Sequence, residues 1–176
     1  MRARAALFWL APPALVVAGP LPAWATVYLT ADEARQAIFP GLAFTRADLE
    51  LTGAQAAEIE KRSGVTVRRR ALSLWRGPAG ETFFVDRVLG KHEDIVYALG
   101  VGGDGRVAGL EILEYRETYG GEIREPAWRR QFTGRTLADP LELGRGITNL
   151  SGATLSCRHV TDGVRRLLAT RALLLG

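Results

Sequence analysis

The sequence predicts an α+β fold in which an antiparallel sheet is flanked by helices, with one further helix at the C-terminus. Segments with helical periodicity stand near both ends of the chain, whereas residues 65–113 alternate at period two and are rich in β-branched and aromatic residues. Helices and strands that are segregated along the chain in this way are typical of α+β domains. The length of 176 residues predicts one domain with a single core.

The first part of the chain has the features of a secretory signal. Two early arginines precede an apolar run from Ala5 to Gly19, and Ala23-Trp24-Ala25 has the small-x-small pattern of a cleavage site. We predict a signal peptide over residues 1–25, cleaved after Ala25, and a domain over residues 26–176. An uncleaved membrane anchor is the alternative, but the apolar run contains two prolines and is shorter than the roughly 20 residues of a spanning helix.

Two helices are predicted before the sheet, after a short extended segment at residues 26–29. Thr30-Ala31-Asp32-Glu33 combines an N-cap with early acidic residues, which predicts a helix through about Phe39. A second helix is predicted from about Thr52 to Arg62, where Ser63-Gly64 ends it. These helices form an N-terminal extension to the rest of the domain.

Four strands are predicted in the middle of the chain, at residues 65–75, 82–89, 95–100 and 107–115. The Asp104-Gly105 pair between the last two is a strong hairpin signal, and it predicts antiparallel pairing. A short helix is predicted from Glu125 to about Phe132. The last helix is predicted from Arg158 to Leu175, and its apolar positions at helical spacing are Val160, Val164, Leu167, Leu168 and Leu174.

Composition excludes several classes of function. Cys157 is the only cysteine, which excludes an internal disulfide and a metal site built on a cysteine pair, and we predict that it is a small core residue rather than a reactive thiol. The formal net charge of +4 falls when the arginines of the signal are removed, so we predict no nucleic-acid partner. His92 and His159 each lack a second ligand nearby in sequence, so we predict no metal site.

A hydroxyl-rich stretch, Ser151-Gly152-Ala153-Thr154-Leu155-Ser156, stands just before the last helix. Hydroxyl groups and small residues at a helix N-terminus favour binding of a phosphate, because backbone N–H groups and the positive end of the helix dipole meet there. The alternative from spacing alone is that Ser151 or Thr154 only caps the helix.

Ser-Gly-Ala-Thr at residues 151–154 resembles the flavin-attachment motif of the FMN-binding domain family. This domain is shared by the C subunit of sodium-pumping NADH:quinone reductase and the G subunit of Rnf complexes. Residues 117–123 resemble the family's Glu-Thr-Pro-Gly-x-Gly loop, with Tyr119 in place of the proline and Glu122 in place of the last glycine, and residues 128–134 match its Trp-x-x-x-Phe-x-Gly segment. One departure is Thr148, which stands where the family usually has an acidic residue three positions before the motif's serine.

The resemblance implies that FMN is bound covalently through a phosphoester to Thr154, and that the loop at residues 117–121 offers polar groups and close backbone approach to the ring. The cofactor-binding residues that it implies are Thr154, Ser151, Gly152, Ala153, Leu155, Ser156, Glu117, Thr118, Gly120, Gly121 and Trp128. Taken alone, the loop is also typical of a turn that ends a strand. Trp128 and Phe132, four positions apart on a helix, are likewise typical of core residues.

The resemblance further implies an electron-transfer protein or subunit rather than a stand-alone enzyme, exported to the periplasm or the outer face of the cytoplasmic membrane. A magnesium-dependent flavin transferase that uses FAD is the implied modifying partner, and membrane or periplasmic redox proteins are the implied electron partners. Arg116, Arg124 and Arg129 are candidates for favouring an anionic reduced flavin. The principal alternative is a non-redox or loosely FMN-binding regulatory module, which Thr148 favours. A flavin-dependent reductase comes last, because no glycine motif for NADH is present.

Overall fold

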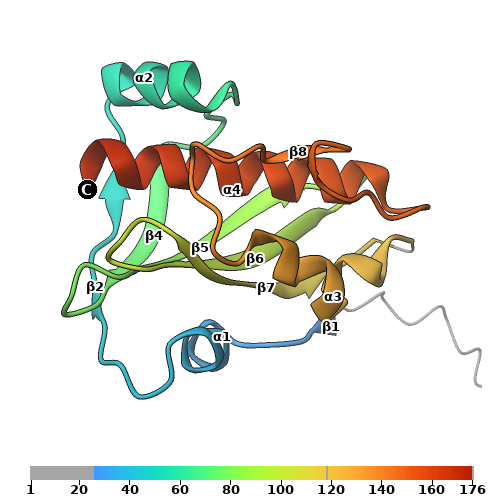
Figure 1. The fold of residues 1–176 in the computed structure, drawn as a ribbon, viewed down its shortest axis with the longest axis horizontal. Coiled ribbons are helices and arrows are strands. Elements are labelled where there is room, and N and C mark those ends of the chain that lie inside the picture. Colours follow the sequence, from blue (N-terminus) through green and yellow to red (C-terminus); the bar gives the residue numbers. More distant parts are fainter. Residues whose placement is uncertain (1–25, 118, 176) are drawn as a thin grey trace, which may run out of the picture.

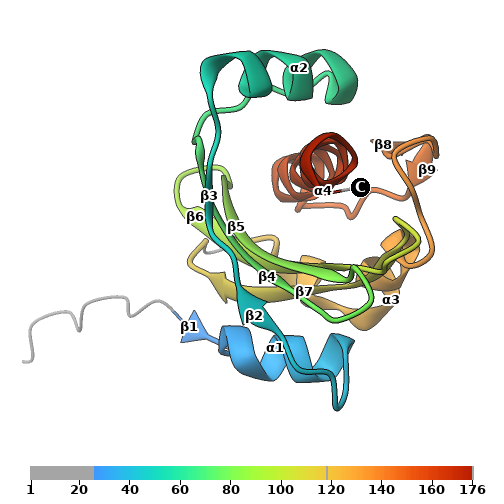
Figure 2. The same cartoon turned by 90° about the vertical axis from the view of Figure 1, so that its left-hand side faces the viewer.

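The structure is a computed structural model, and it describes residues 26–117 and 119–175. Helix α1 (Ala31–Ile38) covers one face of a curved antiparallel sheet, and the long helix α4 (Thr154–Leu174) lies along the other face. Helix α2 (Gly53–Ser63) packs on α4 on the side away from the sheet (Figures 1 and 2). This arrangement confirms the predicted α+β fold. The predicted signal peptide at residues 1–25 lies outside the described residues.

The main sheet has seven strands in the order β1-β7-β6-β5-β4-β2, with β3 paired to β4, and every pairing within it is antiparallel. Its strands are β1 (Thr26–Val27), β2 (Thr45–Arg46), β3 (Leu49–Glu50), β4 (Ala71–Arg76), β5 (Thr82–Leu89), β6 (Asp94–Val101) and β7 (Val107–Tyr115). The three longest strands, β5, β6 and β7, are joined by two consecutive hairpin turns, as the sequence predicts. Gly105, with φ +82°, donates its N–H to Gly102 O at 3.0 Å in the predicted Asp104-Gly105 turn.

Strand β6 lies at the centre of the sheet and is buried on both faces. Ile95 and Tyr97 point into the core beneath α4, whereas Val96 and Ala98 belong to a smaller core beneath α1. Because both faces are covered, the strand is a continuous apolar run rather than an alternating one. The four predicted apolar positions Val160, Val164, Leu167 and Leu168 of α4 are all buried, and Leu174 is half-buried.

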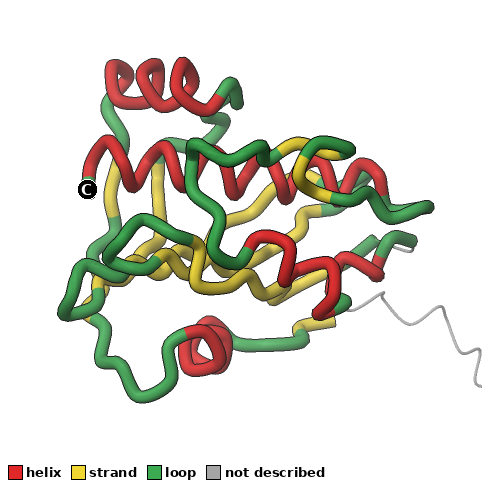
Figure 3. Tube along the Cα trace, viewed as in Figure 1, coloured by secondary structure: helices red, strands yellow, loops and turns green. Residues whose placement is uncertain are grey.

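The two N-terminal helices begin and end close to where the sequence predicts. Both have a complete capping box, with Thr30 and Glu33 in α1 and Thr52 and Gln55 in α2. Gly64 ends α2 in the left-handed conformation, at φ +67°. The predicted short helix appears as α3 (Pro126–Arg129) followed by a 3-10 turn over Arg130–Phe132, and a further 3-10 turn covers Gly121–Arg124 (Figure 3).

The structure differs from the prediction at residues 65–70 and at the start of α4. The strand predicted at residues 65–75 begins only at Ala71, because Val67 N–H donates to the Glu60 carboxylate at 2.7 Å and so is bonded to α2 instead of the sheet. Helix α4 begins at Thr154 rather than Arg158, with a first intrahelical bond from Cys157 N–H to Ala153 O at 2.8 Å. A small parallel pair, β8 (Glu142–Leu143) with β9 (Gly146–Ile147), was not predicted.

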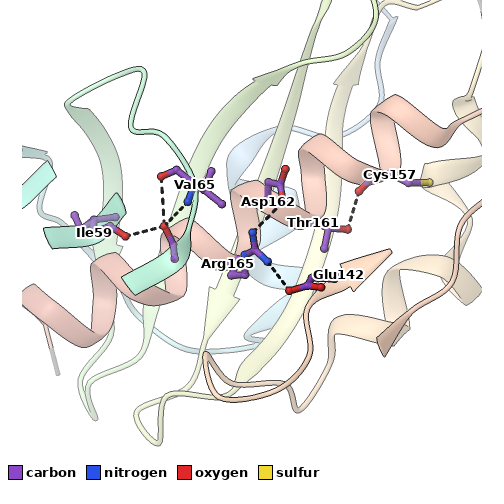
Figure 4. Close-up of polar contacts among 8 residues, drawn as sticks. Ile59, Val65, Glu142, Cys157, Thr161, Asp162 and Arg165 are labelled. Carbon is purple, nitrogen blue, oxygen red and sulfur yellow. Dashed lines mark hydrogen bonds and ion pairs between the residues drawn. The ribbon is translucent and has the colours of Figure 1, made fainter. Parts of the chain in front are cut away.

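Side chains of α4 fix the helix to its surroundings. Arg165 pairs with Asp162 one turn earlier at 3.4 Å and with Glu142 of β8 at 3.3 Å (Figure 4). Near the C-terminal end, the Arg171 guanidinium donates to Gly80 O at 3.2 Å and Gly103 O at 2.9 Å, which ties the helix to two hairpin turns. Over residues 26–117 and 119–175, no helix is long and apolar enough to cross a membrane.

Candidate functional site

The hydroxyl-rich stretch forms a tight turn that leads directly into α4. Gly152 has φ +84°, and a Cβ added there would meet no atom within 4 Å, so one side of the turn is open. Ala153 is the N-cap and makes no side-chain capping bond, and neither Ser151 nor Thr154 takes that role. The first turn of α4 therefore has no side-chain cap at its N-cap residue, which leaves backbone N–H groups there without a side-chain partner from this stretch.

Thr154 is the first residue of α4 and is exposed. Its hydroxyl accepts a hydrogen bond from the Asn149 side-chain amide at 2.9 Å, which leaves the hydroxyl proton available to an outside acceptor. Ser151 and Gly152 are also exposed, and Leu155 is 42 % exposed. Ala153 and Ser156, in contrast, are buried and face the protein interior.

The loop that follows β7 packs directly on the hydroxyl-rich stretch. Tyr115 donates its hydroxyl proton to Tyr119 O, and therefore accepts from the Ser156 hydroxyl at 3.1 Å. A Cβ added at Gly120 would lie 2.6 Å from the Tyr115 hydroxyl and 3.2 Å from Ala153 Cα. Small residues at positions 120 and 153 thus let the two segments touch. Tyr115 was predicted only as a strand residue, and nothing in its sequence context marks it as the link.

Burial raises the pKa of Tyr115 above its ordinary value of 10.0, although the bond with Ser156 opposes this shift. The phenol therefore stays protonated at neutral pH and keeps its role as donor. The neighbouring thiol of Cys157 is buried as predicted, and burial raises its pKa as well. A protonated, buried thiol is a core group and not a nucleophile.

Glu117 supports the turn between β5 and β6. Its Oε1 accepts from the N–H of His92 at 2.5 Å and of Glu93 at 3.0 Å. Desolvation raises the pKa of this carboxyl, but the backbone N–H groups of Glu93, His92 and Lys91 together outweigh it, so the pKa lies below 4.5. Thr118, the other polar residue predicted at the flavin rim, lies outside the described residues. Gly121 begins the 3-10 turn after this loop.

Trp128 is buried and holds the chain that leads into the stretch. Its ring packs edge-on against Phe132, with ring centroids 5.1 Å apart, and its indole N–H donates to Thr148 O at 2.9 Å. Gln131 accepts from Thr148 N–H at 2.7 Å, so both backbone groups of Thr148 are bound by the segment 128–132. The Thr148 side chain itself is exposed.

The three arginines proposed to act on a flavin have partners within the protein. Arg116 pairs with Glu114 at 3.1 Å, and Arg129 pairs with Glu111 and donates to Leu110 O at 2.9 Å. The Arg124 guanidinium lies 4.1 Å from the centre of the Tyr28 ring and donates to Gly121 O at 3.1 Å.

Both histidines lie at or beside the turn between β5 and β6. His92 is exposed in the β5–β6 turn, and His159 donates from Nδ1 to Leu89 O. Among the described residues, no group of three or more His, Cys, Asp or Glu side chains is placed to hold a metal ion.

A cavity of about 630 Å³ lies beside α4, one turn beyond Thr154, and sequence reasoning missed it. Its walls come from the segment after α2, from the ends of β5 and β6, and from α4. Five arginines line it: Arg68, Arg69, Arg87, Arg158 and Arg166. Three aspartates oppose them: Asp86, Asp94 and Asp162. The cavity therefore has an excess of positive charge.

Residues 90–169 match the family model described as the FMN-binding domain. No curated protein matches the chain. The matched region contains the β6–β7 hairpin, the loop that follows it, Trp128 and the Thr154 turn. Over these residues the chain is thus similar to the FMN-binding domain family, and this match supports a flavin-binding protein. The match gives the domain and not a subunit, so the resemblance to the C subunit of the sodium pump and to the G subunit of Rnf complexes stays a prediction.

Proposed function

We propose that this chain, whose residues 90–169 form an FMN-binding domain, carries FMN through a phosphoester to Thr154 and works as an exported electron-transfer protein. The observation that supports it most directly is the Thr154 hydroxyl, which is exposed at the first residue of α4 beside the open turn at Gly152. The residues present fit the phosphate end of FMN, because an accessible hydroxyl, uncapped helix N–H groups and an open approach meet at one point.

The attachment is a phosphoryl transfer to the Thr154 hydroxyl. The Thr154 oxygen attacks the phosphorus on the FMN side of FAD, AMP leaves, and the hydroxyl proton is passed to a base of the magnesium-dependent flavin transferase. Within this chain, Asn149 holds the Thr154 oxygen by donating to it at 2.9 Å, while the turn at Gly152 leaves the line of approach open. The first-turn N–H groups of α4 would hold the phosphate once it is attached.

When bound, FMN supplies transfer of one or two electrons. The protein's part is to retain it and to set its potential. Retention by a covalent bond suits a protein outside the cytoplasm, where a dissociated cofactor has no pool to replace it. We therefore place the protein in the periplasm or on the outer face of the cytoplasmic membrane, with membrane or periplasmic redox proteins as partners. The signal peptide proposed at residues 1–25, with cleavage after Ala25, provides the route of export.

The test is the intact mass of the purified protein after co-expression with a flavin transferase in an exporting host. We expect a wild-type mass that matches residues 26–176 plus FMN, and no FMN on Thr154→Val, which removes the hydroxyl and keeps the shape of the side chain. Thr133→Val is the matched control, because Thr133 is an exposed threonine outside the turn. A wild type that stays unmodified, while the transferase labels a proven substrate, would overturn covalent attachment and favour the non-redox or loosely FMN-binding module.

A further inference from the structure

We propose that the cavity beside α4 receives the ring system of the flavin, and that Arg158 at its mouth binds the phosphate on Thr154. This inference rests on the proposed function. It differs from the arrangement that the resemblance implies, in which the loop at residues 117–121 and Trp128 contact the ring.

Three of the residues expected to contact the ring, Glu117, Gly120 and Trp128, are engaged within the protein. Trp128 is 2 % exposed, and its only donor is bound to Thr148 O. The Glu117 carboxylate accepts two backbone N–H groups of the β5–β6 turn. Gly120 is buried against Tyr115 and Ala153. These three residues thus brace the start of α4 and the β5–β6 turn, and the cavity beside α4 offers the ring a different place.

The cavity is within reach of Thr154. Residues four apart lie one above the other on a helix, so Arg158 is on the same face as Thr154 and about 6 Å along the axis. Side chains of a helix lean toward its N-terminus, which brings the Arg158 guanidinium back over the Thr154 turn. Arg158 and its neighbour His159 both line the cavity, so the ribityl chain has one helical turn to cross before the ring enters.

The size and the walls of the cavity suit a flavin ring. Its volume of about 630 Å³ lies within the usual range of cofactor sites. Val65, Val88 and Leu89 give it an apolar side. Among its lining residues, Arg166 is 7 % exposed and is fixed by Asp86, which also accepts a hydrogen bond from the Tyr97 hydroxyl at 2.6 Å. A guanidinium fixed in this way offers oriented N–H donors to the polar edge of the ring.

The charges of the cavity favour an anion. Arg69 and Arg87 share one carboxylate, Asp94, at 3.5 and 3.4 Å. Arg68 and Arg158 are exposed and have no ion-pair partner among the described residues. The negative charge of a phosphodiester beside Arg158 would offset this excess of positive charge. The negative charge of a reduced ring inside the cavity would offset it as well. The cavity thus favours the reduced flavin.

The experiment compares flavinylated proteins whose loading has been confirmed by intact mass. Arg158→Gln removes the charge at the mouth, and Thr66→Trp places a large side chain at an exposed position of the cavity wall. The matched controls are Arg145→Gln and Ala138→Trp, two exposed positions that line a separate depression of about 470 Å³. The readouts are quenching of flavin fluorescence by neutral acrylamide, fluorescence anisotropy and the midpoint potential.

We expect the wild-type flavin to be protected from acrylamide and to have high anisotropy. Thr66→Trp should raise the quenching constant several-fold toward that of dissolved FMN, and Arg158→Gln should raise it and lower the midpoint potential. Both controls should match the wild type. A wild-type flavin that is attached yet quenched like dissolved FMN would overturn the cavity and leave the proposed function intact. Absence of any attached flavin would overturn both.

Discussion

Gly120 and Gly152 provide a direct measure of how firmly the loop after β7 is anchored on the turn before α4. Both have positive φ, +89° and +84°, so alanine is strained at either position. They differ in their surroundings. A Cβ at Gly152 meets nothing within 4 Å, whereas a Cβ at Gly120 lies 2.6 Å from the Tyr115 hydroxyl. The comparison of Gly120→Ala with Gly152→Ala therefore separates backbone strain from the contact.

The structure sets the expected magnitudes. The left-handed conformation costs an alanine about 1–2 kcal/mol, of which the reduced freedom of the unfolded chain returns about 0.4–1 kcal/mol. Gly152→Ala should therefore lower the free energy of unfolding by about 1 kcal/mol. In Gly120→Ala the Tyr115 hydroxyl must also move and lose its bonds to Tyr119 O and Ser156, each worth about 1 kcal/mol. The total loss should be about 3 kcal/mol.

Urea unfolding of the chain without flavin, followed by tryptophan fluorescence, measures both values. For slopes of about 1–3 kcal/mol per molar urea, a difference of about 2 kcal/mol separates the two midpoints by about 1 M. Equal losses for Gly120→Ala and Gly152→Ala, within about 0.5 kcal/mol, would refute the reasoning, because Tyr115 would then be shown to adjust without cost.

Three further results are expected. Glu117→Gln should lower stability at pH 7 and converge with the wild type as the pH falls below 4.5, because the lowered pKa of Glu117 gives stability that is lost on protonation; a constant difference in urea titrations down to pH 3 would contradict this. Gly163→Ala should destabilise the protein in thermal unfolding by about 1–3 kcal/mol, although alanine normally stabilises a helix interior by about 1 kcal/mol, because the new Cβ meets the Tyr97 hydroxyl; a gain in stability would contradict the packing. Thr148→Asp should speed flavin attachment at limiting transferase without changing the unfolding midpoint, and an unchanged rate in a mass time course would show that the transferase does not require the acid.

The parts of the fold that sequence predicts well are those whose signals are local. Capping residues Thr30 and Thr52 and the left-handed Gly64 define both N-terminal helices within a few positions. The three long strands are rich in β-branched and aromatic residues and are separated by turns with clear signals. Strands of two residues, such as β2 and β3, have no periodicity to detect, and they form only because β4 offers them a partner.

The candidate site likewise has a part with a local sequence signal and a part that depends on contacts between distant segments. The turn at residues 151–154 is visible as a motif, but the position of its neighbours depends on contacts between distant segments. Tyr115 reaches Ser156 across 41 positions in the chain. The arginines of the cavity come from three separate stretches, represented by Arg68, Arg87 and Arg158, and each alone reads as a solvated surface charge.

Thr148 shows how structure changes the meaning of a departure from a family pattern. In sequence, it replaces an acidic residue and weakens the resemblance. In the structure, Trp128 and Gln131 bind its carbonyl and its N–H, so the course of the backbone into the turn does not depend on its side chain. The residue is exposed and therefore accessible from solvent. Under the proposed function, the substitution therefore affects recognition by the transferase and not the backbone geometry before Thr154. For this reason the rate of attachment, and not stability, is the quantity to measure.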